Sequence, residues 1–318
     1  DHFGNPDGID GTMVAEAGSA LIGMQPMTVN RFSLDGTDIT AGVLTGVMVH
    51  PDWRRRGVFL GLLEACEHAA WAAGAALVTT MPNDRSRPGF VKRGYVDPGE
   101  RTLLCLPIGR GGSAPGADWK VSAARTAFGA LATVRGSCRF FELADDLDTE
   151  PVDAFDDDAD RLSRDAANSW PGLFQHRSFD WLTWRYPNRR WSDYRRWRVD
   201  DDSGVMAAFA VSTIESRRGL RVGYLVDMLG RSEQWAAAAA AAACRDLTAS
   251  GVDLVLSVVS TDHLVRILKR IGFVRVPRWL RPKRFHTVFR PAPESPLPME
   301  RLGTIQSWYQ TLGDWDTI

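Results

Sequence analysis

The sequence predicts an α/β protein made of two similar units, each with a central mixed β-sheet flanked by helices. Its 318 residues exceed the length of one ordinary domain and suit two. Hydrophobic residues make up 44% and charged residues 24%, as in globular proteins that bury a sizeable core. The third observation is that both halves repeat the same order of strands and helices.

The first half contains apolar, β-type runs that predict strands over residues 13–24, 41–49 and 76–80. Apolar residues at helical spacing, followed by glycine, predict helices over 57–74 and 87–93. The second half repeats this order, with strands over 205–214, 220–229 and 252–259 and helices over 232–250 and 262–271.

The spacing of the two halves indicates an internal duplication. Pro51 lies 43 positions before Gly94, and Gly230 lies 42 positions before Gly272. The alternative is two unrelated units of similar size. A stretch rich in glycine follows residue 110, so we expect a first domain over 1–110, a linker and connecting helix over 111–135, and a second domain with a C-terminal tail over 136–318.

The duplication also predicts what the first domain lacks. Residues 139–143 predict an opening strand for the second domain, and residues 157–187 predict two helices after it. The matching point of the first unit, near Pro6, has only five residues before it. We therefore expect the first domain to lack its opening strand and helix pair.

Charge and cysteine content exclude several classes of protein. Lys plus Arg is 38 and Asp plus Glu is 39, a balance that argues against a general nucleic-acid or membrane-surface binder. The four cysteines show neither CxxC spacing nor a zinc-ligand pattern, so we expect no metal and no disulfide scaffold. A reduced, cytoplasmic compartment is the expectation that follows.

The strongest functional signal is the stretch V-M-V-H-P-D-W-R-R-R-G-V-F over residues 47–59. A predicted strand ends here, and a helix begins near Gly57. Backbone N–H groups at a helix N-terminus suit a pyrophosphate, and Arg54, Arg55 and Arg56 add positive charge. Three arginines before a helix more often form a solvated patch, but the strand-loop-helix context favours binding.

This stretch resembles the acyl-CoA loop of the GNAT acyltransferase superfamily, whose pattern is Arg/Gln-x-x-Gly-x-Gly/Ala after a central strand. Arg54 and Gly57 match the first two motif positions, whereas Phe59 stands where Gly or Ala is more usual. Residues 83–95 are similar to the family's Asn-x-x-Ser/Ala … Tyr-x-Lys-x-Gly-Phe stretch, which lies beside the pantetheine arm. The resemblance is fairly specific over residues 43–95 and weak elsewhere.

The resemblance implies two tandem GNAT-like domains, the second degenerate, with acetyl-CoA or another acyl-CoA held in the first. It implies that an amine attacks the thioester carbonyl directly. The residues it places at the acyl-CoA are Val47, Val49, Arg54, Arg55, Arg56, Gly57, Val58, Phe59, Asn83, Ser86 and Phe90. Phe90 stands where the family often has a tyrosine that protonates the leaving thiolate, and phenylalanine has no proton to give.

The second unit lacks the phosphate-binding pattern but carries candidate catalytic residues. Eight alanines, residues 236–243, fill its helix and predict close packing on a sheet. Asp227 lies in an apolar strand, where burial would raise its pKa and suit a general base. Pairing with an arginine or capping a loop is the favoured alternative. Tyr224, on the opposite strand face by simple alternation, is a candidate acid or a core residue.

The remaining candidate residues give weaker functional signals. We expect His50 and His263 to be structural. The tail either adds a final strand, which we favour, or closes over a substrate channel, and Asp314 and Asp316 are candidates to face an amine-bearing substrate. Tryptophans and arginines alternate over residues 170–197, which favours a packing helix over base or sugar stacking.

The leading hypothesis is therefore an acyl-CoA-dependent N-acyltransferase, foremost an N-acetyltransferase. We expect acyl-CoA and an amine-bearing small molecule or peptide as partners, with no nucleic acid and no membrane. The sequence leaves open whether the chain forms a homodimer. The alternatives are a non-catalytic binding or assembly module, and a transferase that uses a carrier-protein or aminoacyl-tRNA thioester.

Overall fold

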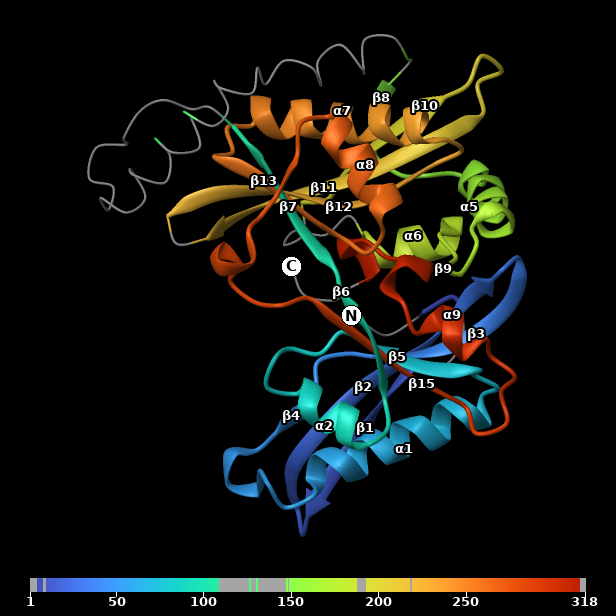
Figure 1. Cartoon of the computed structure of the whole chain (residues 1–318), viewed down its shortest axis with the longest axis vertical. Coiled ribbons are helices and arrows are strands. Elements are labelled where there is room, and N and C mark those ends of the chain that lie inside the picture. Colours follow the sequence, from blue (N-terminus) through green and yellow to red (C-terminus); the bar gives the residue numbers. More distant parts are fainter. Residues whose placement is uncertain are drawn as a thin grey trace.

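Two mixed β-sheets flanked by helices form the fold, which confirms the predicted class. The computed structural model describes residues 5–7, 10–108, 126, 130, 147, 149–187, 193–217 and 219–314. In Figure 1 one sheet occupies the lower half of the molecule and the other the upper half. The predicted linker over 111–135, apart from residues 126 and 130, and the predicted strand over 139–143 lie outside the described residues.

The first sheet has the strand order β16-β9-β2-β3-β5-β15-β6, and both β1 and β4 pair with β2. Most neighbours are antiparallel, but β3 and β5 are parallel, as are β9 and β16. Its strands are β1 (Asp10–Ala17), β2 (Ala20–Leu34), β3 (Thr37–Leu44), β4 (Met48–Val49), β5 (Leu77–Thr80), β6 (Val96–Glu100), β9 (Leu173–Gln175), β15 (His286–Pro291) and β16 (Trp308–Tyr309).

The second sheet has the order β14-β7-β13-β12-β11-β10-β8, with β12 and β13 parallel. Its strands are β7 (Thr102–Pro107), β8 (Thr149–Val152), β10 (Arg195–Asp200), β11 (Met206–Arg217), β12 (Leu220–Gly230), β13 (Leu254–Val259) and β14 (Val274–Arg275).

The helices cover the outer faces of the sheets and fill the space between them (Figure 1). α1 packs beneath the first sheet, α7 packs above the second, and α5 contacts β2, β11 and β12 from both sheets. The α-helices are α1 (Val58–Ala72), α2 (Arg87–Lys92), α5 (Asp158–Ser169), α6 (Phe179–Arg185), α7 (Glu233–Ala249), α8 (Asp262–Arg270) and α9 (Met299–Leu302), and the 3-10 helices are η1 (Pro51–Trp53), η2 (Arg278–Leu280), η3 (Ile305–Ser307) and η4 (Leu312–Asp314). No helix in the described part of the chain is long and apolar enough to cross a membrane.

The two units exchange strands. β7 follows β6 of the first sheet but inserts between β13 and β14 of the second, and β15 returns to lie between β5 and β6 (Figure 1). The exchange is reciprocal at this place, since each sheet accepts one strand of the other unit there. The first sheet also contains β9 and β16 from the second half of the chain. The sheets therefore do not follow a division of the sequence at residue 110, and the domain boundaries given above stay a prediction.

Two predicted strands are each divided in the structure. Residues 13–24 form a hairpin, because the chain turns at Gly18, whose φ is +62°, between β1 and β2. Residues 41–49 form β3 and β4 with a break between them, where Gly46 has a φ of +51°. This break separates the second half of the predicted strand from β3 and directs it along β2.

The alanine-rich helix α7 packs tightly on its sheet, as its composition predicts. Each alanine over residues 236–243 is at most 2% exposed. At Gly230 an added Cβ would lie 2.6 Å from the backbone nitrogen of Ala236, so the start of α7 touches the end of β12. Small side chains allow this approach between helix and strand.

Candidate active site

A cleft opens where β3 and β5 diverge. Their parallel pairing runs from Ala41 opposite Leu77 to Leu44 opposite Thr80, and beyond these residues the two chains separate. The cavity between them has a volume of about 210 Å³. It is lined by Gln25, Thr45, Gly46, Val47, Thr80, Met81, Pro82, Asn83, Ser86, Phe90 and Lys283.

The cleft presents a hydrogen-bond acceptor, and a hydrogen-bond donor lies beside it. Gln25 uses its amide nitrogen to donate to the carbonyl of Thr45 at 2.6 Å, while its buried Oε1 accepts no hydrogen bond from any described residue. His50 N–H donates to the carbonyl of Ile22 in β2, so alternation along the β2–β4 ladder turns the N–H group of Val49 away from β2. Val47, just before β4, lines the cleft. An extended ligand with amide groups would satisfy both groups.

A second, smaller cavity continues the cleft toward the other unit. Its volume is about 50 Å³, and it shares Thr45, Gly46, Thr80 and Met81 with the larger one. Its far wall is Asp314, at the end of η4. The two cavities together run from α2 to the tail of the chain.

The arginine-rich loop forms a left-handed turn at the start of α1. Gly57, the N-cap residue, has a φ of +84°, and Arg55 has a φ of +65°. No atom lies within 4 Å of the place where a Cβ on Gly57 would stand, so this side of the turn is uncovered. Arg54 donates to the carbonyl of Val49 at 3.3 Å, and Arg56 lies over the ring of Trp53 at 5.3 Å.

The structure explains how Phe59 occupies a position where the motif has a small residue. An added Cβ on Gly89 would lie only 2.6 Å from the Phe59 ring, so glycine in α2 makes room for it. Phe59 packs edge-on against Phe90 at 5.2 Å, and Phe90 packs edge-on against Tyr95 at 5.1 Å. Phe90 is 2% exposed and forms part of the cleft wall.

Asn83 and Ser86 hold the first turn of α2 beside the cleft. The side-chain oxygen of Asn83 accepts from the N–H groups of Arg85 and Ser86 at 2.9 and 3.0 Å. Of the eleven residues expected at the acyl-CoA, the structure brings Val47, Asn83, Ser86 and Phe90 into the cleft wall. Val49 lies in β4 and residues 54–59 form the turn and the start of α1 beyond it, and none of these seven lines the cavity.

The equivalent place in the second unit is filled by the chain's own tail. β12 and β13 are parallel only from Val222 to Tyr224, and then they also diverge. The tail enters there: Tyr309 Oη donates to the carbonyl of Met228 at 2.7 Å, and Ser260 N–H donates to that of Gln310 at 3.1 Å. The start of α7 is closed by its contact with Gly230, so this unit offers no open turn like that of Gly57.

Asp227 belongs to a buried charged network. Its side chain is inaccessible to solvent, and its oxygens accept from Tyr186 Oη at 3.0 Å, Thr311 Oγ1 at 2.8 Å and Met228 N–H at 3.0 Å. Arg177 Nε lies 3.4 Å away. A general base must reach the proton it removes, so this geometry favours the ion-pair alternative for Asp227.

Tyr224 lies on the same sheet face as Asp227, not on the opposite one. Tyr224 is opposite Thr213 and Asp227 is opposite Val211, while Val226 is the extra residue of a β-bulge. The bulge reverses the alternation between the two positions. Tyr224 is partly buried, and burial raises its pKa. It packs with Val222 and Leu254 and is not among the residues that line the cleft.

The remaining sequence candidates lie elsewhere. His50 caps η1 by accepting from Asp52 N–H, and His263 lies 3.2 Å from Glu233 at the start of α8. Trp181 is buried in the core of the second unit with Trp184 and Trp197 packed against that core, while Trp191 and Asp316 lie outside the described residues. These placements favour structural roles for both histidines and for the tryptophans that the structure describes.

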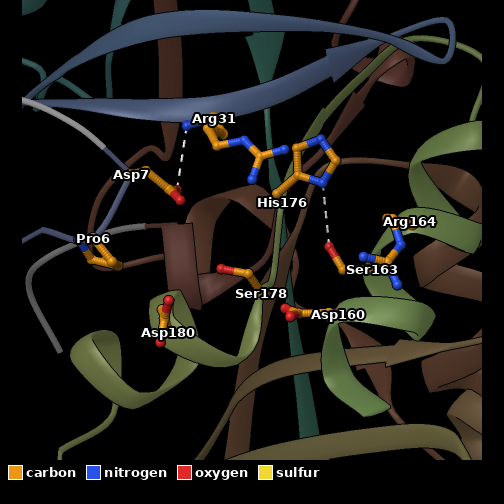
Figure 2. Close-up of a pocket in the computed structure, with 9 residues that line it drawn as sticks. All are labelled: Pro6, Asp7, Arg31, Asp160, Ser163, Arg164, His176, Ser178 and Asp180. Atoms are coloured by element: carbon orange, nitrogen blue, oxygen red, sulfur yellow. Dashed lines mark hydrogen bonds between the residues drawn. The ribbon is translucent and has the colours of Figure 1, made fainter. Parts of the chain in front are cut away.

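Another polar cavity, of about 210 Å³, lies between β2 and helices α5 and α6. Figure 2 shows Asp7 accepting from the backbone of Arg31, and His176 facing Ser163. Many of its polar groups already hold neighbouring segments together: Asp160 accepts from Phe179 N–H, Ser163 from Arg177 N–H, and Ser178 from Trp181 N–H. These hydrogen bonds join α5 and α6 to the segment between β9 and α6, so structural contacts within the second unit account for most of the polar groups of this cavity.

Sequence reasoning missed the part of the cleft that comes from distant segments. Gln25 and Thr80 lie in β2 and β5, and Thr45 and Met81 directly follow β3 and β5. Lys283 comes from the connection between β14 and β15. No local signal predicts Lys283, because it reaches the first unit only through the exchanged strand β15. Within the described residues, no cluster of His, Cys, Asp and Glu could hold a metal ion.

Most of the cleft wall and the left-handed turn lie within a stretch that resembles a known family of protein domains. Residues 7–96, which contain β1 to β5, the left-handed turn and α2, match the family model of the acetyltransferase (GNAT) domain. No curated protein shows a significant sequence match to the chain.

Solved structures share the fold of most of the chain at low identity. A GCN5-related N-acetyltransferase from Anabaena variabilis has a TM-score of 0.60 and 12% identity over 88% of this chain and 62% of its own. N-myristoyltransferase of Saccharomyces cerevisiae, solved with bound myristoyl-CoA, has a TM-score of 0.54 and 10% identity over 86% of this chain and 68% of its own. A tandem GNAT protein from the clavulanic acid biosynthesis pathway has a TM-score of 0.52 and 13% identity over 92% of this chain and 86% of its own.

These matches confirm the resemblance to the GNAT superfamily and the tandem arrangement of two GNAT-like units. The chain spans 62% of the length of the Anabaena protein.

Proposed function

We propose that this protein is an N-acyltransferase that binds acyl-CoA, foremost acetyl-CoA, in the cleft of its first unit and transfers the acyl group to a primary amine. The GNAT fold supports an acyltransferase in general. The choice of acetyl-CoA and the position of the site are our inference from the cleft.

The observation that carries the proposal is a left-handed turn at the start of α1 next to the cleft: Phe59 of α1 packs against Phe90, which forms part of the cleft wall. The open, left-handed turn at Gly57 suits the pyrophosphate. The pantetheine arm carries amide groups, and these would meet the N–H group of Val49 and the unsatisfied Oε1 of Gln25. The thioester would then lie at the divergence of β3 and β5.

A comparison of the two units predicts that each chain binds one molecule of acyl-CoA. In the second unit the tail occupies the divergence of β12 and β13, and the start of α7 packs against Gly230. Neither the arm nor the pyrophosphate of a second molecule would find a place there. In this proposal the second unit has a structural role, and its tail supplies part of the cleft wall.

The test is a melting experiment followed by a transfer assay. Acetyl-CoA and CoA at about 100 times the dissociation constant should each stabilise the protein by about 2.7 kcal/mol. Combined Arg56→Ala and Gly57→Asp substitutions should remove that shift and the transfer of acetyl groups to amines. Arg217→Ala, at an exposed end of β11, is the matched control and should behave like the wild type.

Two results would reject the proposal. One is a melting temperature that neither acetyl-CoA nor CoA changes, and the other is a doubly substituted protein that still transfers acetyl groups at the wild-type rate. Competition by free CoA also separates this function from one that uses a carrier-protein thioester, because CoA should compete with acetyl-CoA only in the first case.

A further inference from the structure

The tail of the chain connects the two sheets next to the cleft. β16 pairs with β9 of the first sheet, while Tyr309 Oη bonds to the backbone of β12 in the second. The Gln310 side chain accepts from Thr287 Oγ1 of β15 at 2.8 Å. η4 follows directly and is therefore anchored from both sides, ending at Asp314.

Asp314 faces the divergence of β3 and β5. It lines the smaller cavity together with Leu44, Thr45 and Thr80, and its side chain is 3% exposed. Among the described residues that line the two cavities, it is the one with an acidic side chain. The predicted central strand over 41–49 holds no Asp or Glu, so a carboxylate at this place has to come from elsewhere.

The neighbours of Asp314 hold it but leave it room to accept a proton. Oδ2 accepts from Arg177 Nη2 and from Thr311 N–H, both at 2.7 Å. Oδ1 lies 3.2 Å from the amide nitrogen of Gln175, in the amide orientation that also lets the Gln175 oxygen accept from Trp181 and Asn30. Because a carboxylate oxygen has two lone pairs, Oδ1 keeps one that no described residue uses.

Arg177 is fixed in its place behind Asp314. Its Nη1 donates to the carbonyl of Gln175 at 2.7 Å, and its backbone N–H donates to Ser163 Oγ at 2.8 Å. Its Nε also lies 3.4 Å from Asp227, so one guanidinium serves two buried carboxylates.

The charge balance of this network makes Asp314 a better proton acceptor than an ordinary aspartate. Burial raises its pKa, Arg177 opposes that rise, and the second carboxylate, Asp227, adds to it. Tyr186, Tyr309, Arg101 and Arg185 also face the network, and Arg185 Nε donates to the carbonyl of Gly313 at 2.8 Å. A base whose pKa lies closer to the working pH transfers protons more effectively.

We propose, on the basis of the proposed function, that Asp314 accepts the proton of the acceptor amine and that Arg177 positions the Asp314 carboxylate. The amine nitrogen forms a bond to the thioester carbonyl carbon, and the bond from carbon to sulfur breaks. The proton lost by nitrogen moves to Asp314 Oδ1. Asp314 then releases that proton through solvent to the leaving thiolate, which becomes the thiol of free CoA, and Asp314 returns to its ionised form. Acyl-CoA and amine become amide and free CoA with no further reactant.

The first test is the structure of the whole chain with bound acetyl-CoA. The thioester carbonyl should lie at the divergence of β3 and β5, near enough to Asp314 for one amine nitrogen to contact both at about 3 Å. A thioester bound in the cleft but remote from Asp314 overturns this inference and leaves the proposed function intact. Failure of acetyl-CoA to bind rejects both.

The second test compares two buried carboxylates that share Arg177. With ethylamine and with water as acceptors for the acetyl group, Asp314→Asn should lose about 100-fold or more in rate at unchanged acetyl-CoA affinity. Asp227→Asn, whose carboxylate does not line the cavity, should lose only a few-fold. Equal losses in the two variants, or no wild-type rate above the solution reaction, overturn the inference.

A third measurement excludes a purely structural effect. Asp314→Ala leaves a gap beside the cleft, and added formate should restore part of its rate. Arg177→Lys removes a fixed, fork-shaped donor from Asp314, and the acid limb of the pH–rate profile should move to higher pH. No rescue by formate in a folded Asp314→Ala protein, or an unmoved acid limb, contradicts the assigned roles.

Discussion

Gly57 allows a sharp test of the turn at the start of α1, because α1 contains a second glycine as a built-in control. Gly57 has a φ of +84°, a region that costs a residue with a side chain about 1–2 kcal/mol. Gly61 lies inside α1, where alanine is favoured over glycine by about 0.8–1.0 kcal/mol. Neither position has an atom within 4 Å of an added Cβ, so steric clashes do not confuse the comparison.

Gly57→Ala should therefore destabilise the protein and Gly61→Ala should stabilise it. Alanine also restricts the unfolded chain, which offsets the cost at position 57 by about 0.4–1 kcal/mol. The two variants should differ in unfolding free energy by roughly 2 kcal/mol, measured by urea unfolding followed by circular dichroism. Acetyl-CoA affinity should fall about tenfold in Gly57→Ala, equivalent to about 1.4 kcal/mol, and stay unchanged in Gly61→Ala.

The reasoning would be refuted by two variants of equal stability, since the turn would then not depend on a left-handed residue. Equal acetyl-CoA affinity in both would refute the link between the turn and the pyrophosphate. A loss of affinity in Gly61→Ala alone would place the ligand on another face of α1.

Three further predictions concern packing, buried charge and the thiols. Gly89→Ala should cost about 1–3 kcal/mol, since its Cβ would lie 2.6 Å from Phe59, and adding Phe59→Leu should recover most of that loss in urea unfolding. Arg177→Met should cost about 3–5 kcal/mol by leaving two buried carboxylates without their cation, and a stability within about 1 kcal/mol of the wild type would contradict the network. Burial raises the pKa of Cys66 and of Cys105 to about 12, so peptide-resolved labelling at pH 8 should find both thiols unreactive until urea unfolds the chain.

Local sequence patterns predicted the order of elements and the local part of the cleft. The break after β3, the turn at Gly57 and the start of α2 lie within about forty residues, so Val47, Asn83, Ser86 and Phe90 could be located from one continuous stretch. The expected strand over 41–49 was nevertheless too long, because Gly46 adopts a positive φ there.

Long-range features could not be predicted in the same way. Lys283 reaches the cleft because the units exchange strands, and Asp314 reaches it because the tail runs between the sheets. Neither arrangement leaves a local pattern in the sequence. The bulge at Val226 has no residue signature of its own, yet it places Tyr224 on the same face of the sheet as Asp227. The tail was weighed either as a strand or as a cover for a channel, and it forms the short strand β16 and then part of the cavity wall.

The measurement that tests the central claim most directly is a calorimetric titration of acetyl-CoA into the whole chain. The account predicts one equivalent bound for each chain, with binding lost in Gly57→Asp and kept in the Gly61→Ala control. A stoichiometry of two, or undiminished binding in Gly57→Asp, would contradict the assignment of the site to the divergence of β3 and β5.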